Sequence, residues 1–164
     1  MSKTIITWKD IDDVSTKVAN KIKQDKININ CLIGLSRGGL VPATILAHQL
    51  GVREVLVHGY HSYDDKHNIR DYENRHGVMY QDVVYDLRKS LLGRNILIVD
   101  DLCDEGVTMK GLLERLKKKF HEGAVNIRTA VLYRKTHSIY KPNYIGKDDL
   151  DNSWIQFPWE VSTE

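Results

Sequence analysis

Apolar residues recur along the chain in two patterns, one typical of helices and the other of buried strands. Helical spacing predicts one helix over 8–23 and another over 108–121. The apolar faces contain Ile11, Val14, Val18 and Ile22 in the first helix and Leu112, Leu113, Leu116 and Phe120 in the second. Residues 40–50 predict a further helix, which tolerates Pro42 in its first turn and ends before Gly51.

Short continuous apolar runs predict buried strands. The clearest run is 95–99, which leads into two aspartates. The other predicted strands are 31–35, 54–60, 78–85 and 126–133. Residues 63–76 are polar and predict a loop, 87–92 are ambiguous, and the C-terminal part predicts irregular structure.

Local signals mark the ends of the predicted helices. Thr7 and Asp10 are spaced like a capping box, with Asp in place of the usual Glu. Thr108 is expected to cap the helix over 108–121, and Gly123 to close it.

The alternation of helices and strands favours an α/β fold: a mostly parallel, twisted sheet flanked by helices. Ligands of such sheets bind outside the carboxyl ends of the strands. Ser36–Gly39 and Asp100–Thr108 each follow a predicted strand, so we expect both at the same edge of the sheet. The chain shows no internal repeat or composition break, which predicts a single domain over 1–164.

Composition excludes several classes of protein. Lys plus Arg is 24 and Asp plus Glu is 22, and this net charge of +2 argues against a nucleic-acid binder. Two cysteines make no disulfide framework, and no stretch approaches the roughly 20 apolar residues of a membrane span. The first residues lack the apolar core of a signal peptide, so a cytoplasmic location is expected.

The segment Asp100–Thr108 combines carboxylates with the start of a helix. A helix N-terminus favours phosphate through its backbone N–H groups and its dipole. Carboxylates beside a phosphate make chemical sense when a divalent cation or sugar hydroxyls lie between them. The alternative reading is an acidic, solvated turn that caps a helix.

Ser36–Gly39 is a glycine-rich turn that contains a cation. Glycines allow a ligand to approach the backbone closely, and the guanidinium of Arg37 suits a pyrophosphate. Taken alone, the same four residues are also compatible with an ordinary turn.

Together these segments resemble the type I phosphoribosyltransferases. Asp100 and Asp101 match the family's acidic pair, which contacts the ribose hydroxyls of phosphoribosyl pyrophosphate. Asp104 matches the loop aspartate proposed as general acid/base near the purine. The loop around the 5′-phosphate corresponds to Asp104, Glu105, Gly106, Val107 and Thr108, and the pyrophosphate loop to Ser36, Arg37, Gly38 and Gly39.

The resemblance extends to the purine site and is closest to the bacterial xanthine-guanine enzymes. Lys135 matches the lysine that faces the 6-oxo group, Trp154 the ring that stacks on the base, and Ile155 the backbone that reads its edge. Ser62 and Tyr63 resemble the start of the flexible hood, expected with its adjoining strand over 60–95. Residues 135–164 would form the base-binding tail.

This resemblance implies a purine salvage transferase. It would join guanine, xanthine or hypoxanthine to phosphoribosyl pyrophosphate and release pyrophosphate. Mg²⁺ is the implied cofactor, with Asp101 as its ligand and Asp100 as a second candidate. A homodimer or homotetramer is also implied.

Two residues depart from the family pattern. Glu105 stands where Thr is usual, and a carboxylate directed at a phosphate would repel it; directed outward, it would favour the helix N-terminus. Glu160 stands where close relatives often have Asp. Glu105 motivates the alternative of a non-catalytic nucleotide-binding regulator on the same fold.

Other readings of the sequence are weaker. A receiver-type signalling domain places its acidic pair early in the chain, and Gly34–Gly39 lacks the G-x-G-x-x-G spacing of a dinucleotide site. The histidines near residue 60 have no spacing that completes a metal site. The tyrosines between 60 and 85 are compatible with a lid over the substrate, a subunit contact or neither.

Overall fold

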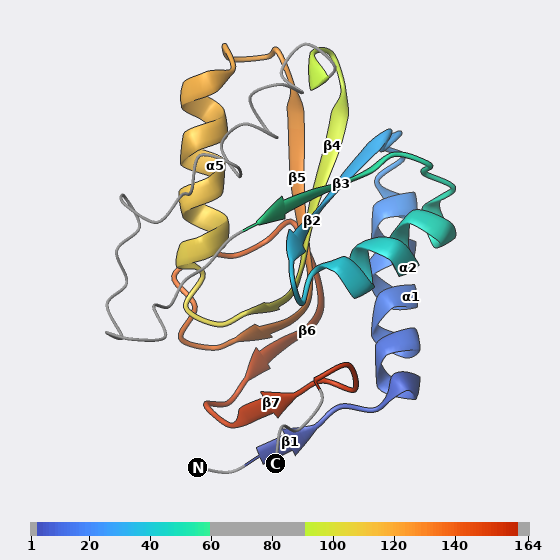
Figure 1. The fold of residues 1–164 in the computed structure, drawn as a ribbon, viewed down its shortest axis with the longest axis vertical. Helices are drawn as coiled ribbons and strands as arrows, with labels where there is room; N and C mark the ends of the chain where they lie inside the picture. The colour runs from blue at the N-terminus through green and yellow to red at the C-terminus, as the bar shows by residue number, and fades with distance from the viewer. Residues whose placement is uncertain (1–2, 60–90, 161–164) are drawn as a thin grey trace.

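The computed structural model describes residues 3–59 and 91–160 (Figure 1). The elements in chain order are β1 (Lys3–Ile5), α1 (Trp8–Gln24), β2 (Cys31–Ser36), α2 (Leu40–Leu50), β3 (Val55–Gly59), β4 (Asn95–Cys103), α5 (Val107–Lys119), β5 (Asn126–Lys135), β6 (Tyr144–Leu150) and β7 (Trp154–Gln156). The predicted hood residues Ser62 and Tyr63, the predicted strand 78–85 and the tyrosines from Tyr60 to Tyr85 lie outside the described residues.

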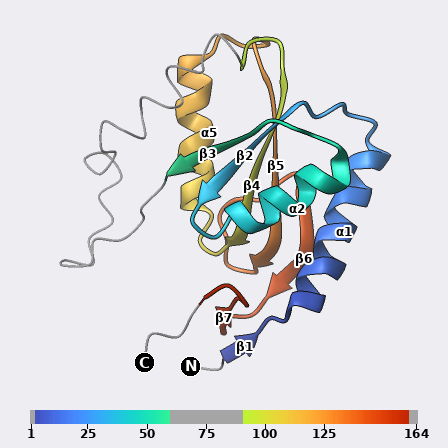
Figure 2. The same ribbon diagram turned by 45° about the vertical axis from the view of Figure 1, so that its right-hand side comes forward.

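The described strands form a main sheet in the order β3-β2-β4-β5-β6, in which all neighbours are parallel. Helices α1 and α2 cover one face and α5 covers the other, as the two views of the ribbon show (Figures 1 and 2). The predicted fold class, a mostly parallel sheet flanked by helices, is confirmed.

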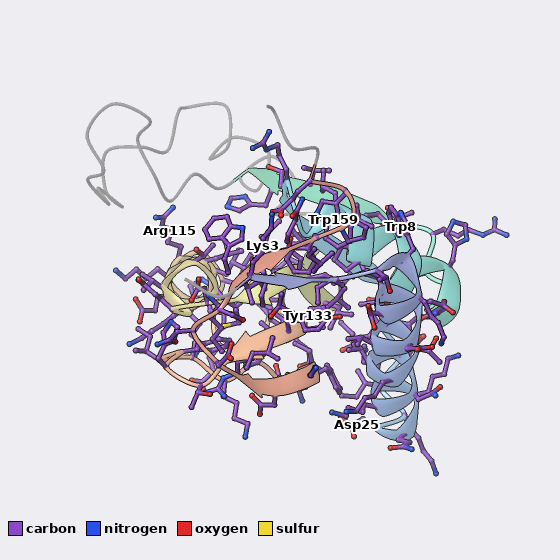
Figure 3. The ribbon with its side chains drawn as sticks, turned by 90° about the horizontal axis from the view of Figure 1, so that it is seen from below. Lys3, Trp8, Asp25, Arg115, Tyr133 and Trp159 are labelled. Atoms are coloured by element: carbon purple, nitrogen blue, oxygen red, sulfur yellow. The ribbon has the colours of Figure 1, made fainter. Side chains whose placement is uncertain are left out.

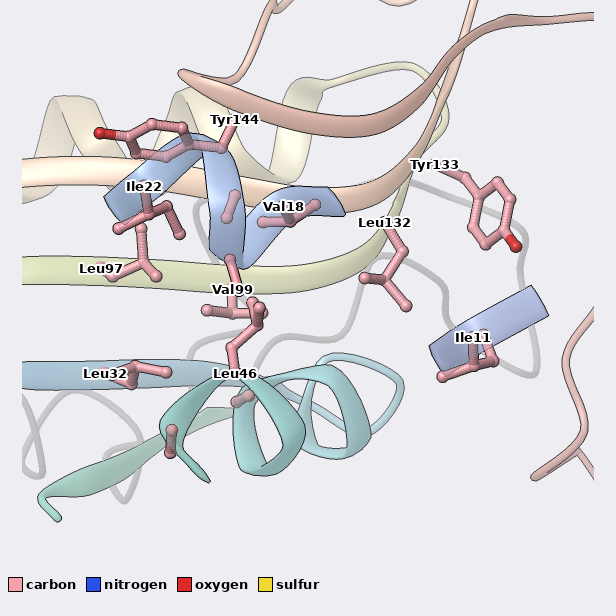
Figure 4. Packing of buried hydrophobic residues seen from close by; sticks show 14 of the residues in the cluster. Ile11, Val18, Ile22, Leu32, Leu46, Leu97, Val99, Leu132, Tyr133 and Tyr144 are labelled. Atoms are coloured by element: carbon pink, nitrogen blue, oxygen red, sulfur yellow. The ribbon is translucent and has the colours of Figure 1, made fainter. Parts of the chain in front are cut away.

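Strand β4 supplies side chains to both layers of the core. Leu97 and Val99 pack in the cluster with α1 and α2, whereas Ile96 and Ile98 pack in the cluster with α5. Successive side chains of a strand point to opposite faces, so a continuous apolar run is what a strand buried on both faces requires. Figure 4 shows the first layer, where side chains of the sheet meet those of both helices.

Helix α1 forms where its capping box and apolar stripe predict it. Thr7 Oγ1 accepts a hydrogen bond from the backbone N–H of Asp10 at 3.2 Å, and the Asp10 carboxylate accepts one from the Thr7 N–H at 2.8 Å. The buried face contains Ile11, Ser15, Val18, Ala19 and Ile22. These contacts fix the start of the helix and its orientation on the sheet.

Strands β4 and β5 are longer than predicted. Asp100 is paired with Val131 and Leu102 with Tyr133, so the acidic pair lies within β4 rather than after it. Lys135 is likewise the last residue of β5 rather than a residue beyond it. The pairing continues because each strand satisfies the backbone polar groups of the other, whatever the side chains are.

The start and end of α5 also differ from the prediction. The N-cap is Gly106, in the left-handed region with φ of 81°, and no described side chain caps the helix, so Thr108 lies inside the first turn. Phe120, rather than Gly123, is the C-cap. Gly106 must be a glycine here, because a Cβ would lie 2.5 Å from Ser138 Oγ and 2.8 Å from Tyr140 N.

The C-terminal part is not irregular, so that prediction was wrong. It contains β6 and then β7, which pairs with β1 in parallel at Lys3↔Trp154 and Thr4↔Ile155. The partners of β7 lie about 150 residues earlier in the chain, so no local pattern could indicate this pair.

Candidate active site

Three loops meet at the carboxyl edge of the sheet, where parallel α/β folds bind their ligands. Residues 37–39 follow β2, residues 104–106 follow β4, and residues 136–138 follow β5. Because β2, β4 and β5 are adjacent strands, their loops must be neighbours.

The glycine-rich turn packs directly against the acidic pair. A Cβ added to Gly38 would overlap the carboxylate of Asp101, and one added to Gly39 would lie 2.6 Å from the carbonyl oxygen of Val99. The Ser36–Arg37 peptide is cis, and the side chain of Arg37 is exposed. The structure thus brings the two segments singled out in the sequence into contact.

The acidic pair is electrostatically unfavourable in the free protein. Burial raises the pKa of Asp101 to about 6, and the nearby charge of Glu160 adds to this rise. Burial raises the pKa of Asp100 as well, reinforced by the charge of Asp101. Asp100 Oδ1 accepts the N–H of Asp101 at 2.9 Å, and Asp101 Oδ1 accepts that of Leu102 at 2.7 Å, which fixes both carboxylates.

Asp104 has the opposite environment, because two nitrogens contact its carboxylate. Lys135 Nζ lies 3.1 Å from Oδ2, and His137 Nε2 lies 2.8 Å from Oδ1. The Lys135 side chain is only 8% exposed and that of Asp104 is 48% exposed, so a buried cation holds a carboxylate that faces solvent. The structure therefore brings together two residues predicted for the site, which lie 31 positions apart.

The segment after β5 packs against the loop before α5 and holds it in place. The Glu105 carbonyl accepts the N–H of Ile139 at 2.9 Å, and Gly106 lies against Ser138 and Tyr140. The N-terminus of α5, with Val107 and Thr108 in its first turn, follows at once. A helix N-terminus without a side-chain cap among the described residues is suited to an anion.

The aromatic side chain predicted to stack on the base is open to solvent. Trp154 is 60% exposed at the start of β7, whereas Ile155 is buried. The turn before them is held by a hydrogen bond between Ser153 Oγ and Thr4 Oγ1 at 2.9 Å. The exposed indole offers a flat apolar surface of the kind on which a base stacks.

A set of stacked rings fixes the chain after β7. Phe157 and Trp159 are parallel with centroids 4.7 Å apart, and Trp159 reaches Trp8 of α1 at 5.9 Å. Phe157 also contacts Tyr133 of β5 at 5.8 Å. Figure 3 shows Trp8 and Trp159 close together at the N-terminus of α1. Phe157 and Trp159 therefore have fixed positions against α1 and β5.

Two polar residues of this region were missed in the sequence. His137 contacts Asp104, and its Nδ1 lies 2.7 Å from Oδ1 of Asn152. The position of His137, two residues after Lys135, which the sequence already assigned to the site, was the available signal. Asn152 had none, because it is brought near only by the turn between β6 and β7.

The donor set fits a magnesium ion that arrives with its substrate. Among residues 3–59 and 91–160, no group of three or more His, Cys, Asp and Glu side chains could hold a metal alone. Asp100 and Asp101 supply hard carboxylate oxygens. Burial raises their pKa values, so a bound cation would stabilise their ionised forms. Mg²⁺ is commonly bound by one or two carboxylates plus substrate phosphates, which is the arrangement available here.

The fold and this edge of the sheet define a phosphoribosyltransferase. The family model described as phosphoribosyl transferase domain matches residues 3–164, and the chain belongs to this family. No helix in the described part of the chain has the length and apolar character needed to cross a bilayer.

Individual relatives are named for purines. The xanthine-guanine phosphoribosyltransferase of Idiomarina loihiensis is 29% identical over 95% of this chain and 86% of its own. The crystal structure of a purine phosphoribosyltransferase from Pyrococcus horikoshii is 29% identical, with a TM-score of 0.72 over 100% of this chain and 97% of that one. A hypothetical protein from Neisseria gonorrhoeae, solved with bound ppGpp, shares the fold at 23% identity, with a TM-score of 0.77 over 99% and 91% of the two chains.

Proposed function

We propose that this chain is a purine phosphoribosyltransferase. It joins guanine, xanthine or hypoxanthine to phosphoribosyl pyrophosphate, giving the nucleoside monophosphate and pyrophosphate. The observation that carries this proposal is the Asp104–Lys135 pair beside the acidic pair and the glycine-rich turn. The names of the relatives support a purine as the accepted base.

The reaction breaks the bond from the anomeric carbon to pyrophosphate and forms a bond to a purine nitrogen. Positive charge develops on the sugar, as in glycoside hydrolysis. Asp100 and Asp101 hold the ribose hydroxyls, the turn with Arg37 holds the pyrophosphate, and the N-terminus of α5 holds the 5′-phosphate. These contacts place the anomeric carbon where the purine can reach it.

The purine lies between the acid/base residue and the tail. Its imidazole proton passes to the carboxylate of Asp104 as the new bond forms. Lys135 donates to the 6-oxo group, Trp154 stacks on the ring, and the backbone at Ile155 reads the base edge. Hood residues that begin at Ser62 and Tyr63 would exclude water, which otherwise hydrolyses the sugar.

Asp101, with Asp100 as a second candidate, would hold Mg²⁺. When bound, this ion neutralises charge on the pyrophosphate leaving group. Because the pair is incomplete as a metal site, we expect phosphoribosyl pyrophosphate to bind poorly without magnesium and the metal to bind poorly without phosphoribosyl pyrophosphate. Calorimetry with each alone and with both together tests this expectation.

A direct assay tests the proposed function. Protein, Mg²⁺ and phosphoribosyl pyrophosphate are mixed with each of the three purines, and nucleotide formation is followed. We expect turnover with at least one base. Absence of turnover with all three would contradict the proposal.

Glu105 supports a second candidate, a nucleotide-binding regulator without activity. A carboxylate in the phosphate loop would weaken a transferase more than it would a simple binding protein. Calorimetry with nucleoside monophosphates and ppGpp, which is bound in a protein of the same fold, separates the two. Tight binding without turnover would favour the regulator.

Assembly and location remain expectations from the family. We propose a homodimer or homotetramer that acts in the cytoplasm. Light scattering after size-exclusion chromatography gives the oligomeric state, and a monomeric mass would contradict the first part.

A further inference from the structure

The proposed reaction assigns no role to His137, although this residue contacts Asp104. It holds one oxygen of Asp104 while Lys135 holds the other, at 2.8 Å and 3.1 Å. An ionised carboxylate only accepts hydrogen bonds, so Nε2 of His137 must donate. The carboxylate is thereby fixed in a single plane.

The other side of the ring reaches a different part of the chain. Nδ1 lies 2.7 Å from Oδ1 of Asn152, two residues before Trp154. The amide of Asn152 can accept from Nδ1–H or, turned over, donate to a bare Nδ1. The ring therefore has a partner at this nitrogen whether it is neutral or charged.

The segment that carries His137 is anchored at both ends. Thr136 donates its N–H and its hydroxyl to the carbonyl of Leu150, at 2.9 Å and 3.0 Å. The N–H of Ser138 returns to the carbonyl of Lys135 at 3.1 Å. His137 thus stands on a fixed turn between the loop of Asp104 and the turn that precedes Trp154.

The two donors to Asp104 have different tasks in the proposed reaction. Lys135 faces the 6-oxo group of the purine, so its contact with Asp104 weakens when the base binds. The ring of His137 is held between Asp104 and Asn152, so its contact with Asp104 can persist. At the moment of proton transfer, the orientation of Asp104 then depends on His137.

We propose that His137 is a positioning residue for purine transfer, which orients Asp104 and couples it to the turn that precedes Trp154. This inference rests on the proposed function. The purine proton still passes to Asp104, and His137 neither gains nor loses a covalent bond. A carboxylate displaced by 1 Å loses much of its effect, so the contact affects the chemical step.

The test compares His137→Ala and His137→Gln with a control, His121→Ala, which removes an exposed histidine from outside the site. We expect His137→Ala to lower kcat about tenfold, with the KM for phosphoribosyl pyrophosphate within about twofold. The amide N–H of Gln can reach Asp104, so His137→Gln should recover most of kcat, and His121→Ala should leave kcat unchanged.

Two results would overturn the proposal. The first is a kcat of His137→Ala within about twofold of the natural protein. The second is a Gln variant as impaired as the Ala variant, with both KM values and the melting temperature changed, which indicates a purely structural role.

A measurement without turnover keeps this inference separate from the proposed function. The ¹⁵N shift of His137 Nε2 should change in Asp104→Ala, while the shifts of His121 stay in place; an unchanged His137 signal would overturn the contact. If the natural protein turns over no purine, the proposed function fails. If it is active and His137→Ala is too, only the role of His137 fails.

Discussion

Two carboxylate sites at the same sheet edge have opposite environments. Asp100 and Asp101 lie in β4 with raised pKa values, chiefly because burial disfavours their charges; the charge of Asp101 adds to the rise at Asp100, and that of Glu160 to the rise at Asp101. Asp104, a few residues on, faces solvent and is held by Lys135 and His137. The first site is suited to a cation that arrives with the substrate, and the second is complete in the free protein. In the proposed function, one residue type would therefore serve binding in one place and proton transfer in the other.

The largest loss of activity is expected from a substitution of Asp104, whose contacts are complete in the free protein. Asp104→Asn keeps the size of the side chain but cannot take the purine proton. We expect kcat to fall about 10³-fold, the usual range for general acid/base groups, with much weaker loss of nucleotide affinity. Steady-state kinetics and calorimetry on the same preparation check this. Equal losses of kcat and affinity would argue against the acid/base role.

The next largest loss of activity is expected when the contact between the glycine-rich turn and the acidic pair is disturbed. A methyl group in Gly38→Ala would overlap the carboxylate of Asp101, so either the turn or the carboxylate must move. We expect kcat/KM for phosphoribosyl pyrophosphate to fall about a hundredfold.

Gly111→Ala is the matched control for Gly38→Ala. It adds the same methyl group within α5, where no described atom lies within 4 Å of the new position. We expect unchanged kinetics and a slightly more stable helix. Equal kinetics of the two alanine variants would contradict the proposed contact.

The residues of the two sites differ in how far the sequence predicts them. Asp100, Asp101 and Asp104 follow an apolar run, and strand burial plus the family pattern indicates their place. Their difference in environment was not predictable, because Asp104 is paired through His137 and Lys135, which lie more than 30 residues away.

The same limit applies to the fold. Helix α1 and the central strands follow from local periodicity. The β1–β7 pair does not, since Thr4 and Ile155 are paired strand residues about 150 positions apart in the sequence. Gly146 gives a further example: a Cβ there would lie 2.6 Å from Leu132 O, and this close packing leaves no pattern in the sequence.

The unfavourable acidic pair predicts a pH-dependent stability. The folded carboxyl of Asp101, with a pKa of about 6, binds its proton more tightly than the unfolded one at the ordinary value of 3.8. Stability of the metal-free protein should therefore fall as pH rises from about 4 to 6 and stay lower above that. Asp101→Asn, which has no charge, should raise the free energy of unfolding by about 1–2 kcal/mol at pH 7.

Urea unfolding at pH 7 and at pH 4 measures this effect. Most of the gain of Asp101→Asn should disappear at pH 4, where the folded carboxyl is protonated and the unfolded one, with its ordinary pKa of 3.8, is about half protonated. Asp12→Asn, on the exposed face of α1, should change stability by less than about 0.5 kcal/mol at either pH. A gain of equal size at both pH values would point to packing instead of charge.

The smallest change in activity is expected from a substitution of Glu105. Its backbone carbonyl holds the N–H of Ile139, and any residue retains that contact. A carboxylate just before the first turn of α5 favours the helix N-terminus. We therefore expect Glu105→Thr to change kcat/KM for phosphoribosyl pyrophosphate by less than about threefold, because the loss of that dipole interaction is small. A gain of tenfold or more would show that the natural carboxylate opposes the phosphate, which would favour the nucleotide-binding regulator.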